Sequence, residues 1–213
     1  MQVQGVIEPP ANPSAAFGPG ILVPEAELRR WLRRCGRGVR VFQGARFVSP
    51  DVIALGDYTQ IDEGTFLIGG DGLEVGCHVH LAFGSSVSGG GRCVVGDFAA
   101  IAAGARIITG TDLADGTGLT NPTVPPHYRA VKRGQVRIGE HALIFTNTVV
   151  LPDVTIGEGA VVGAGSVVHY DLQPWTVYAG VPLRQVGARP HERILELAEQ
   201  VRRQDLTRAG AKG

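Results

Sequence analysis

The chain has 213 residues with 20 basic and 20 acidic side chains, so its formal net charge is zero and its length suffices for one domain with a substantial core. This balance gives no indication of a nucleic-acid-binding surface, and no apolar run is long enough for membrane insertion. The three cysteines, Cys35, Cys77 and Cys93, form no disulfide pattern and no signal peptide is apparent, so we expect a cytoplasmic protein.

The N-terminal part predicts an irregular extension followed by a short helix. Residues 1–22 are rich in Pro, Gly and Ala. Pro24 and the following EAELRRWLRR are typical of a helix that has Pro near its first turn and acidic residues ahead of basic ones. Gly36 and Gly38 are expected to end this helix.

From Leu55 onward the chain repeats every six residues, with an aliphatic residue leading each hexad. Three hexads make an 18-residue coil with three short strands. Five coils are led by the triplets Leu55–Ile61–Leu67, Val75–Leu81–Val87, Val95–Ile101–Ile107, Ile138–Ile144–Val150 and Ile156–Val162–Val168. A weaker coil is indicated near Val41 and Phe47. A strict short period predicts an all-β solenoid, in which each coil buries its apolar edge against its neighbours.

The corners of the coils are as regular as the apolar positions. The second place of the first hexad is Gly in every coil: Gly56, Gly76, Gly96, Gly139 and Gly157. The fourth place of the second hexad holds Gly64, Gly84, Gly104, Asn147 and Gly165. We expect both sets at corners whose backbone angles disfavour a Cβ atom. The fourth place of the first hexad carries rings, which predicts a vertical stack of Tyr58, His78, Phe98 and His141.

One long interruption breaks the period. Residues 111–135, TDLADGTGLTNPTVPPHYRAVKRGQ, predict a loop, and loops of this length are usually functional or disordered. After Asp171 the chain leaves the solenoid, and a charged amphipathic helix is expected over about 191–208. End helices would cover the open strand edges of the solenoid. We therefore divide the chain into an extension with a helix (1–40), a solenoid domain with its loop (41–189), and a C-terminal helix and tail (190–213).

The hexads, and the exit segment AGVPLR after a Pro-Trp pair, resemble the hexapeptide-repeat acyltransferases over roughly residues 50–190. The resemblance implies a left-handed parallel β-helix, a homotrimer with active sites in the clefts between subunits, and acetyl-CoA as co-substrate with no metal. The segments GLTNPTVPPHYR and VKRGQVRIGEH resemble a branch that acylates sugars for bacterial surface polysaccharides. Some members of that branch act on the amine of nucleotide-linked 4-amino-4,6-dideoxysugars. We therefore expect acetyl transfer to the amine of a sugar or nucleotide-sugar acceptor, with transfer to a sugar hydroxyl as the alternative.

A thioester is already activated, so the enzyme need only position the acceptor, remove a proton and stabilise the oxyanion. His80 is the leading candidate for the general base because it takes the outward-facing sixth place of its hexad. A polar surface or interface role is the alternative for this residue. His127 in the long loop is the second catalytic candidate, because that loop would reach a neighbouring subunit's cleft. Some amino-sugar N-acetyltransferases of this architecture use no protein base, and that alternative also stays open.

The candidate acceptor ligands lie in or beside the loop: Asp112, Asn121, Tyr128 and Arg129. Asp112 suits a sugar hydroxyl or an ammonium group, and Arg129 suits a phosphate. Each also suits a purely structural role in ordering the loop. For the donor, the resemblance places the pantetheine arm near the backbone of Ala164 and Gly165, and the CoA phosphates near Arg184 and Arg189. Trp175 would either cover the adenine or close the end of the coil.

Apolar residues at outward-facing places indicate an interface and fit a cyclic trimer: Phe66, Leu143, Val149, Val161 and Val167. Scattered surface hydrophobes are the alternative interpretation. Two other functions also remain. The γ-class carbonic anhydrases share the coil and bind zinc through three histidines, but the His pair five residues apart that they need is missing here. A trimeric scaffold without activity is the other possibility.

Overall fold

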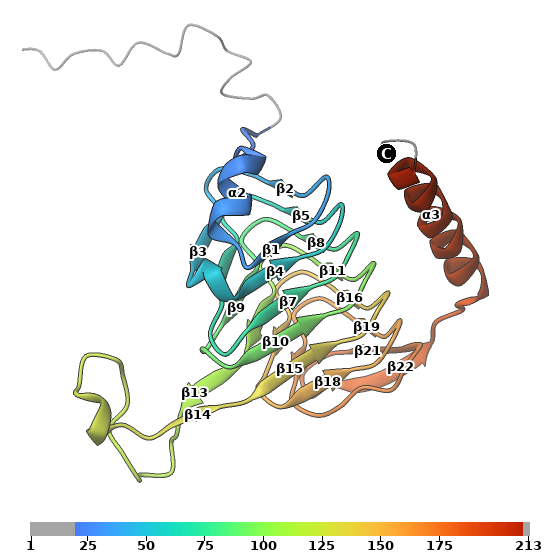
Figure 1. Ribbon diagram of the computed structural model, residues 1–213. Coiled ribbons are helices and arrows are strands. Elements are labelled where there is room, and N and C mark those ends of the chain that lie inside the picture. Colours follow the sequence, from blue (N-terminus) through green and yellow to red (C-terminus); the bar gives the residue numbers. More distant parts are fainter. Residues whose placement is uncertain (1–19, 211–213) are drawn as a thin grey trace, which may run out of the picture.

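The computed structural model describes residues 20–210, and in it the hexads wind into a parallel β-solenoid of about seven turns (Figure 1). The first wall contains β1 (Arg34–Cys35), β4 (Ile53–Leu55), β7 (Leu73–Val75), β10 (Arg92–Val95), β15 (Gln135–Ile138) and β18 (Val154–Ile156). The second wall contains β2 (Arg40–Val41), β5 (Gln60–Ile61), β8 (His80–Leu81), β11 (Ala100–Ile101), β16 (Leu143–Ile144), β19 (Val161–Val162) and β21 (Thr176–Ala179), and antiparallel to the last strand β22 (Arg184–Ala188). The third wall contains β3 (Arg46–Val48), β6 (Phe66–Ile68), β9 (Ser86–Ser88), β12 (Arg106–Ile108), β17 (Val149–Val150) and β20 (Val167–Val168).

The core follows the predicted period. Every hexad leader of the five predicted coils is at most 2% exposed, and equivalent leaders stack in register, as Leu81 does on Ile101. Val41 is also buried, which confirms the weaker coil. The paired strands begin earlier than this coil, because β1 at Arg34 already pairs with β4. The solenoid interior is thus a continuous column of aliphatic side chains.

The outward-facing apolar places behave as predicted with one exception. Phe66 is 36% exposed, and Leu143, Val149 and Val167 are partly exposed. Val161 is only 9% exposed, so the expectation of an outward apolar surface is wrong at this position. The branched side chains of Leu143 and Val177 flank Val161 in register on the neighbouring strands.

The two sets of corner residues serve different purposes. Gly64, Gly84, Gly104, Asn147 and Gly165 have φ between +57° and +70°, which confirms the left-handed corner. The glycines at the second place of the first hexad lie outside the left-handed region, so backbone angle is not the reason for them. A Cβ atom on Gly139 would lie 2.6 Å from the backbone nitrogen of Glu158. Close approach of successive coils therefore requires glycine at these places.

A helix, a long loop and a short 3-10 helix lie outside the three walls of the solenoid. The helix α2 (Glu25–Trp31) lies at the N-terminal end and buries Leu28. The loop begins in β13 (Gly110–Asp112), passes through the short 3-10 helix η2 (Pro126–Tyr128) and returns in β14 (Val131–Arg133). Another 3-10 helix, η1 (Pro50–Val52), connects β3 to β4. Most of the predicted N-terminal extension, residues 1–19, lies outside the described residues.

The sequence predicts that the C-terminal helix covers the open edge of the last coil. The helix α3 (Glu192–Gly210) instead runs beside the stack of coils (Figure 1). When the coil of β1, β2 and β3 is counted as the first, Asp205 of α3 contacts His78 on the third coil, and Arg202 of α3 contacts Glu140 on the fifth. The β21–β22 hairpin stands at the C-terminal end instead. Neither α2 nor α3, the α-helices of residues 20–210, has the length and apolar content needed to cross a bilayer.

Candidate active site

His80 projects from β8 onto the outer face of the second wall, as the hexad predicts. Its side chain is 46% exposed, and its Nε2 atom lies 2.9 Å from Oδ2 of Asp62 on the preceding coil. The other oxygen of Asp62 accepts a hydrogen bond of 2.7 Å from the amide of Gln60. The imidazole is therefore held by a carboxylate while one side stays open to solvent, an arrangement that suits a general base.

Sequence reasoning does not find Asp62. This residue lies in the corner after β5, at a hexad place that holds Ala82, Ala102 and Phe145 in the following coils, so no repeated residue type draws attention to it. The signal that was available is register, because Gln60 and His80 are paired positions on β5 and β8. An acid two residues beyond Gln60 therefore lies one coil away from His80.

Three of the predicted acceptor ligands meet at the base of the loop. Arg129 Nη2 donates to Oδ1 of Asp112 over 2.7 Å, and the backbone N–H of Asn121 lies 3.4 Å from Oδ2 of the same carboxylate. The side chains of Arg129 and Asp112 are 21% and 27% exposed. Asp112 thus ties the two arms of the loop together, and it neutralises the charge of Arg129.

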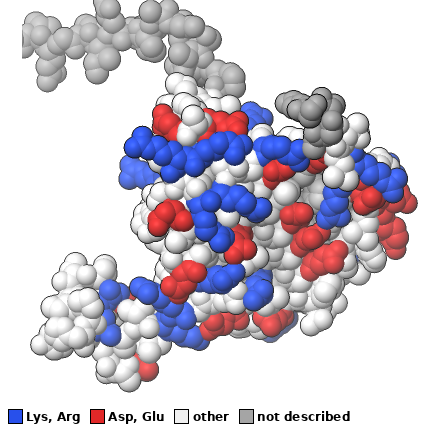
Figure 2. Space-filling view, in the orientation of Figure 1, with Lys and Arg blue, Asp and Glu red and all other residues white. Residues whose placement is uncertain are grey.

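The other two loop candidates lie on η2 and face solvent. The rings of His127 and Tyr128 are 4.0 Å apart between centroids, and Tyr128 is 58% exposed. Beside them is an open pocket of about 470 Å³ lined by Pro126, Arg129, Val131 and Arg133. Figure 2 shows basic side chains at this junction between the loop and the solenoid. The pocket is chemically suited to an anionic group such as a phosphate.

A single copy of the chain does not bring these candidates into one site. His80 lies on the second wall, whereas the loop leaves the solenoid after β12 of the third wall. The loop then extends away from the stack (Figure 1). His80 and His127 are therefore on separate surfaces of one copy.

The predicted ring stack forms and is longer than expected. The ring centroids of Tyr58 and His78 are 5.0 Å apart, those of His78 and Phe98 are 5.0 Å apart, and those of Phe98 and His141 are 5.3 Å apart. Trp175 continues the stack from His141 at 5.9 Å, and its other neighbour is His191 at 4.8 Å. His78 and His141 therefore have a packing role, and the position of Trp175 fits closure of the coil.

The predicted donor residues lie in the last two coils. Ala164 and Gly165 form an exposed corner after β19, where the backbone is open to a ligand. Arg184 is exposed on β22, and its Nη1 donates to the carbonyl of Leu183 over 3.0 Å. Arg189 is used differently. Its Nη1 donates to the carbonyls of His141 and Gly159 at 2.7 and 3.0 Å, and burial lowers the pKa of this guanidinium.

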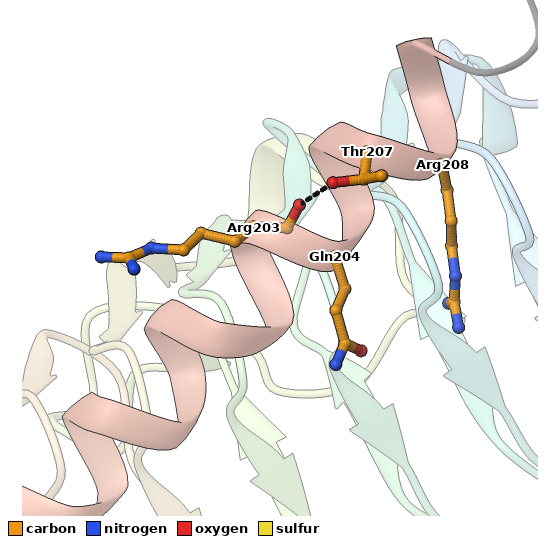
Figure 3. Close-up of a pocket in the computed structure, with 4 residues that line it drawn as sticks. All are labelled: Arg203, Gln204, Thr207 and Arg208. Atoms are coloured by element: carbon orange, nitrogen blue, oxygen red, sulfur yellow. Dashed lines mark hydrogen bonds between the residues drawn. The ribbon is translucent and has the colours of Figure 1, made fainter.

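Another concavity, of about 420 Å³, lies along α3 and contains none of the predicted residues. It is lined by Arg203, Gln204, Thr207 and Arg208 (Figure 3). Gln204 and Arg208 point towards the solenoid, whereas Arg203 points away from it. The described residues contain no group of three His, Cys, Asp or Glu side chains placed to hold a metal ion.

Comparisons with known proteins agree with this architecture. The family model of the bacterial transferase hexapeptide (six repeats) matches residues 135–169. The dTDP-4-amino-4,6-dideoxy-D-glucose acyltransferase of Escherichia coli is 34% identical over 163 residues, which are 76% of this chain and 84% of the relative.

Solved structures of one enzyme are similar over nearly its whole length. The structure of AntD, an N-acyltransferase from Bacillus cereus, in complex with dTDP and 3-hydroxybutyryl-CoA has a TM-score of 0.80 and 31% identity, and the match covers 87% of this chain and 98% of that one. A variant of AntD in complex with dTDP-4-amino-4,6-dideoxyglucose and coenzyme A has a TM-score of 0.78 and 32% identity over the same shares of the two chains.

Proposed function

Because this chain belongs to the hexapeptide-repeat acyltransferases, we propose that it transfers an acyl group from acyl-CoA to the 4-amino group of dTDP-4-amino-4,6-dideoxyglucose. The observation that carries the proposal is the extent of the match, which covers 84% of the E. coli relative and 98% of AntD. The E. coli relative is named as an acyltransferase of this amino sugar. AntD is named as an N-acyltransferase, and one of its variants has been solved with this amino sugar bound. This favours nitrogen over a sugar hydroxyl. We further propose surface polysaccharide synthesis as the context.

The acyl group is either acetyl, as the sequence leads us to expect, or a longer hydroxyacyl chain such as AntD holds in its complex with 3-hydroxybutyryl-CoA. In both cases the amine attacks the thioester carbonyl directly. A C–N bond forms, the C–S bond breaks, the CoA thiolate leaves, and the nitrogen loses a proton. His80 receives that proton in our proposal, because its imidazole is exposed and already bonded to a carboxylate.

We propose a homotrimer in which the loop of one copy approaches the second wall of the next. The separation of His80 from the loop within one copy supports this arrangement. Exposed rings on the solenoid support it as well, since Phe66, Phe83 and Phe145 are 36%, 60% and 41% exposed. Association of copies would bury such exposed apolar side chains. The site is complete in this proposal only when two copies associate.

The remaining candidates divide between the two substrates. We assign Asp112, Asn121, Tyr128 and Arg129 to the acceptor, with the basic pocket beside η2 for its phosphates and His127 at the edge of the site. We assign the open corner at Ala164 and Gly165 to the pantetheine arm, and Arg184 to the CoA phosphates. Arg189 and Trp175 would support the donor site from the corner that they stabilise.

The test is a matrix of two donors and three acceptors. The donors are acetyl-CoA and 3-hydroxybutyryl-CoA, and the acceptors are dTDP-4-amino-4,6-dideoxyglucose, its 4-hydroxy counterpart and a simple glycoside. Thiol release is followed by absorbance, and mass spectrometry identifies the product. We expect an N-acylated product from the amino sugar alone. Acylation of the hydroxyl sugars would favour the O-acetyltransferase alternative, and CoA binding without turnover on any acceptor would favour the scaffold.

A further inference from the structure

Three connected polar side chains lie on the second wall: Gln60 on β5, His80 on the neighbouring strand β8, and Asp62 in the corner that follows β5. Gln60 Nε2 donates to Oδ1 of Asp62 over 2.7 Å, and Oδ2 of Asp62 lies 2.9 Å from Nε2 of His80. The backbone under these side chains is held by the sheet, because the N–H of Asp62 donates to the carbonyl of Leu81 over 2.9 Å. The three side chains are therefore presented from a rigid part of the solenoid.

The Asp62 carboxylate pairs with the imidazole of His80. Within residues 20–210, His80 is the one basic side chain within 4 Å of the Asp62 carboxylate. The Asp62 side chain is 23% exposed, whereas the His80 side chain is 46% exposed. The next residue in register beyond His80 is Ala100, whose small side chain leaves the far side of the imidazole accessible. The carboxylate thus holds one edge of the ring, and the other edge faces solvent.

A carboxylate can only accept a hydrogen bond, so it selects the imidazole tautomer that carries its proton on Nε2. The lone pair of Nδ1 is then free to take a proton from an amine. When it does so, the carboxylate also stabilises the imidazolium that forms. Gln60 contributes by holding the second carboxylate oxygen, which keeps the first one aimed at the ring.

We propose that Asp62 is a positioning residue for His80, and that Gln60 fixes the orientation of the Asp62 carboxylate. During acyl transfer the amine proton passes to Nδ1 of His80, while the Nε2 proton stays hydrogen-bonded to Asp62. This inference rests on the proposed function, because it requires His80 to act as the base. It adds two residues that the hexad pattern does not single out.

The decisive variant is Asp62→Asn, whose amide can donate to Nε2 and so favours the opposite tautomer. Glu63→Gln is the matched control, because it removes one negative charge from an exposed neighbour in the same corner. Gln60→Leu removes the bond that orients the carboxylate. We expect kcat to fall by about 10²-fold in Asp62→Asn, within the range of a general base, and by less in Gln60→Leu. Glu63→Gln is expected to match the wild type.

A second readout separates positioning from mere structural support. Long-range ¹H–¹⁵N spectra of ¹⁵N-histidine-labelled protein report the tautomer of His80, whose signals are assigned by their loss in His80→Gln. We expect Nε2–H in the wild type and Nδ1–H in Asp62→Asn. An unchanged tautomer in Asp62→Asn, or an unchanged kcat, overturns the proposal. If the wild type acylates no amino sugar, the proposed function fails, and the spectra still decide whether Asp62 sets the tautomer.

Discussion

His78 on the third coil and Asp205 on α3 are 127 positions apart in the sequence, yet their Nε2 and Oδ2 atoms lie 2.6 Å apart. Their side chains are 23% and 15% exposed. One turn earlier on the helix, Arg202 pairs with Glu140 at 2.6 Å and places its guanidinium 5.1 Å from the centre of the Phe98 ring. Ala198 is the buried side chain in the described part of α3. Polar contacts with the ring corner therefore hold this helix in place together with the buried Ala198.

Asp205→Asn should loosen α3 without unfolding the solenoid. The substitution removes a charge-assisted hydrogen bond, so the free energy that docks the helix should fall by about 1–3 kcal/mol. Hydrogen exchange followed by mass spectrometry should then show faster exchange in 198–208, with β8 and β11 as protected as in the wild type. Glu199→Gln is the control, because it breaks an exposed pair with Arg203 on the same helix. Equal exchange of α3 in Asp205→Asn and the wild type would contradict the prediction.

His141 should make the protein less stable in mild acid. The residue is 4% exposed, and its Nε2 atom has no hydrogen-bond partner within residues 20–210. Burial is the main cause that lowers its pKa below 6.5, and the charges around it are Glu140, Glu158, Arg189 and Arg202. The unfolded chain therefore binds a proton more readily than the folded one. The contribution of neutral His141 to the free energy of unfolding is complete above pH 6.5. It decreases as the pH falls towards the lower pKa that His141 has in the folded protein.

His141→Phe tests this prediction. Phe98 already adopts φ +57° at the equivalent place, so a phenyl ring is compatible with the φ of +58° at position 141. The variant should lose less stability than the wild type between pH 6.5 and pH 5.5 in urea unfolding, because one titrating group is gone while the other histidines are unchanged. Parallel losses in the two proteins would show that His141 does not titrate in this window.

The parts of this molecule that the sequence predicts well are those that repeat. Leu81 and Ile144 are buried because the six-residue step returns each leader to the same inner edge, and the rings from Tyr58 to His141 stack for the same reason. The position of α3 could not be predicted. An amphipathic pattern shows that a helix has a packing face, but not which surface it meets. The contact between Asp205 and His78 depends on the length and direction of the chain between Arg189 and His191.

Gly139→Ala should destabilise the solenoid more than Gly187→Ala does. A Cβ atom at 139 would lie 2.6 Å from the backbone nitrogen of Glu158, and the N–H of Gly139 is itself bonded to Ile156 across the same gap. The two coils cannot move apart without losing the hydrogen bonds between their strands. We therefore expect the free energy of unfolding to fall by about 1–3 kcal/mol in Gly139→Ala. At Gly187 the described part of the chain, apart from the two adjacent residues, places no atom within 4 Å of the added Cβ. Urea unfolding at one fixed protein concentration compares them, and equal losses would show that coil spacing adapts.

Asp112→Asn should weaken binding of the acceptor sugar more than binding of the acyl-CoA donor. The carboxylate bonds both Arg129 and the backbone of Asn121, and it is our candidate partner for the acceptor's ammonium group. Loss of its charge should raise KM for the amino sugar by about tenfold, which corresponds to one charge-assisted hydrogen bond. KM for acyl-CoA should change little, because the donor residues lie in other coils. Initial rates with each substrate varied in turn measure both constants, and an unchanged acceptor KM would leave Asp112 a loop-ordering residue only.

Cys93 should resist alkylation until the protein unfolds. Its side chain is fully buried on β10, and burial raises the pKa of the thiol to about 12. The thiolate is the reacting form, so iodoacetamide at pH 8 meets neither the charged sulfur nor an open path to it. Cys77 is partly exposed and should react first, although burial also raises its pKa.

Peptide mass spectrometry over a time course measures the three thiols in one sample, and urea-unfolded protein supplies the reference in which all three react alike. Native labelling of Cys93 at the rate of Cys77 would mean that the first wall opens near β10 on the timescale of the reaction. The result also bears on the acyl-transfer assay, because any cysteine that reacts in the native state adds to the thiol signal from released CoA. If Cys77 alone does so, replacing it with Ser should remove that background and leave the rate of CoA release unchanged.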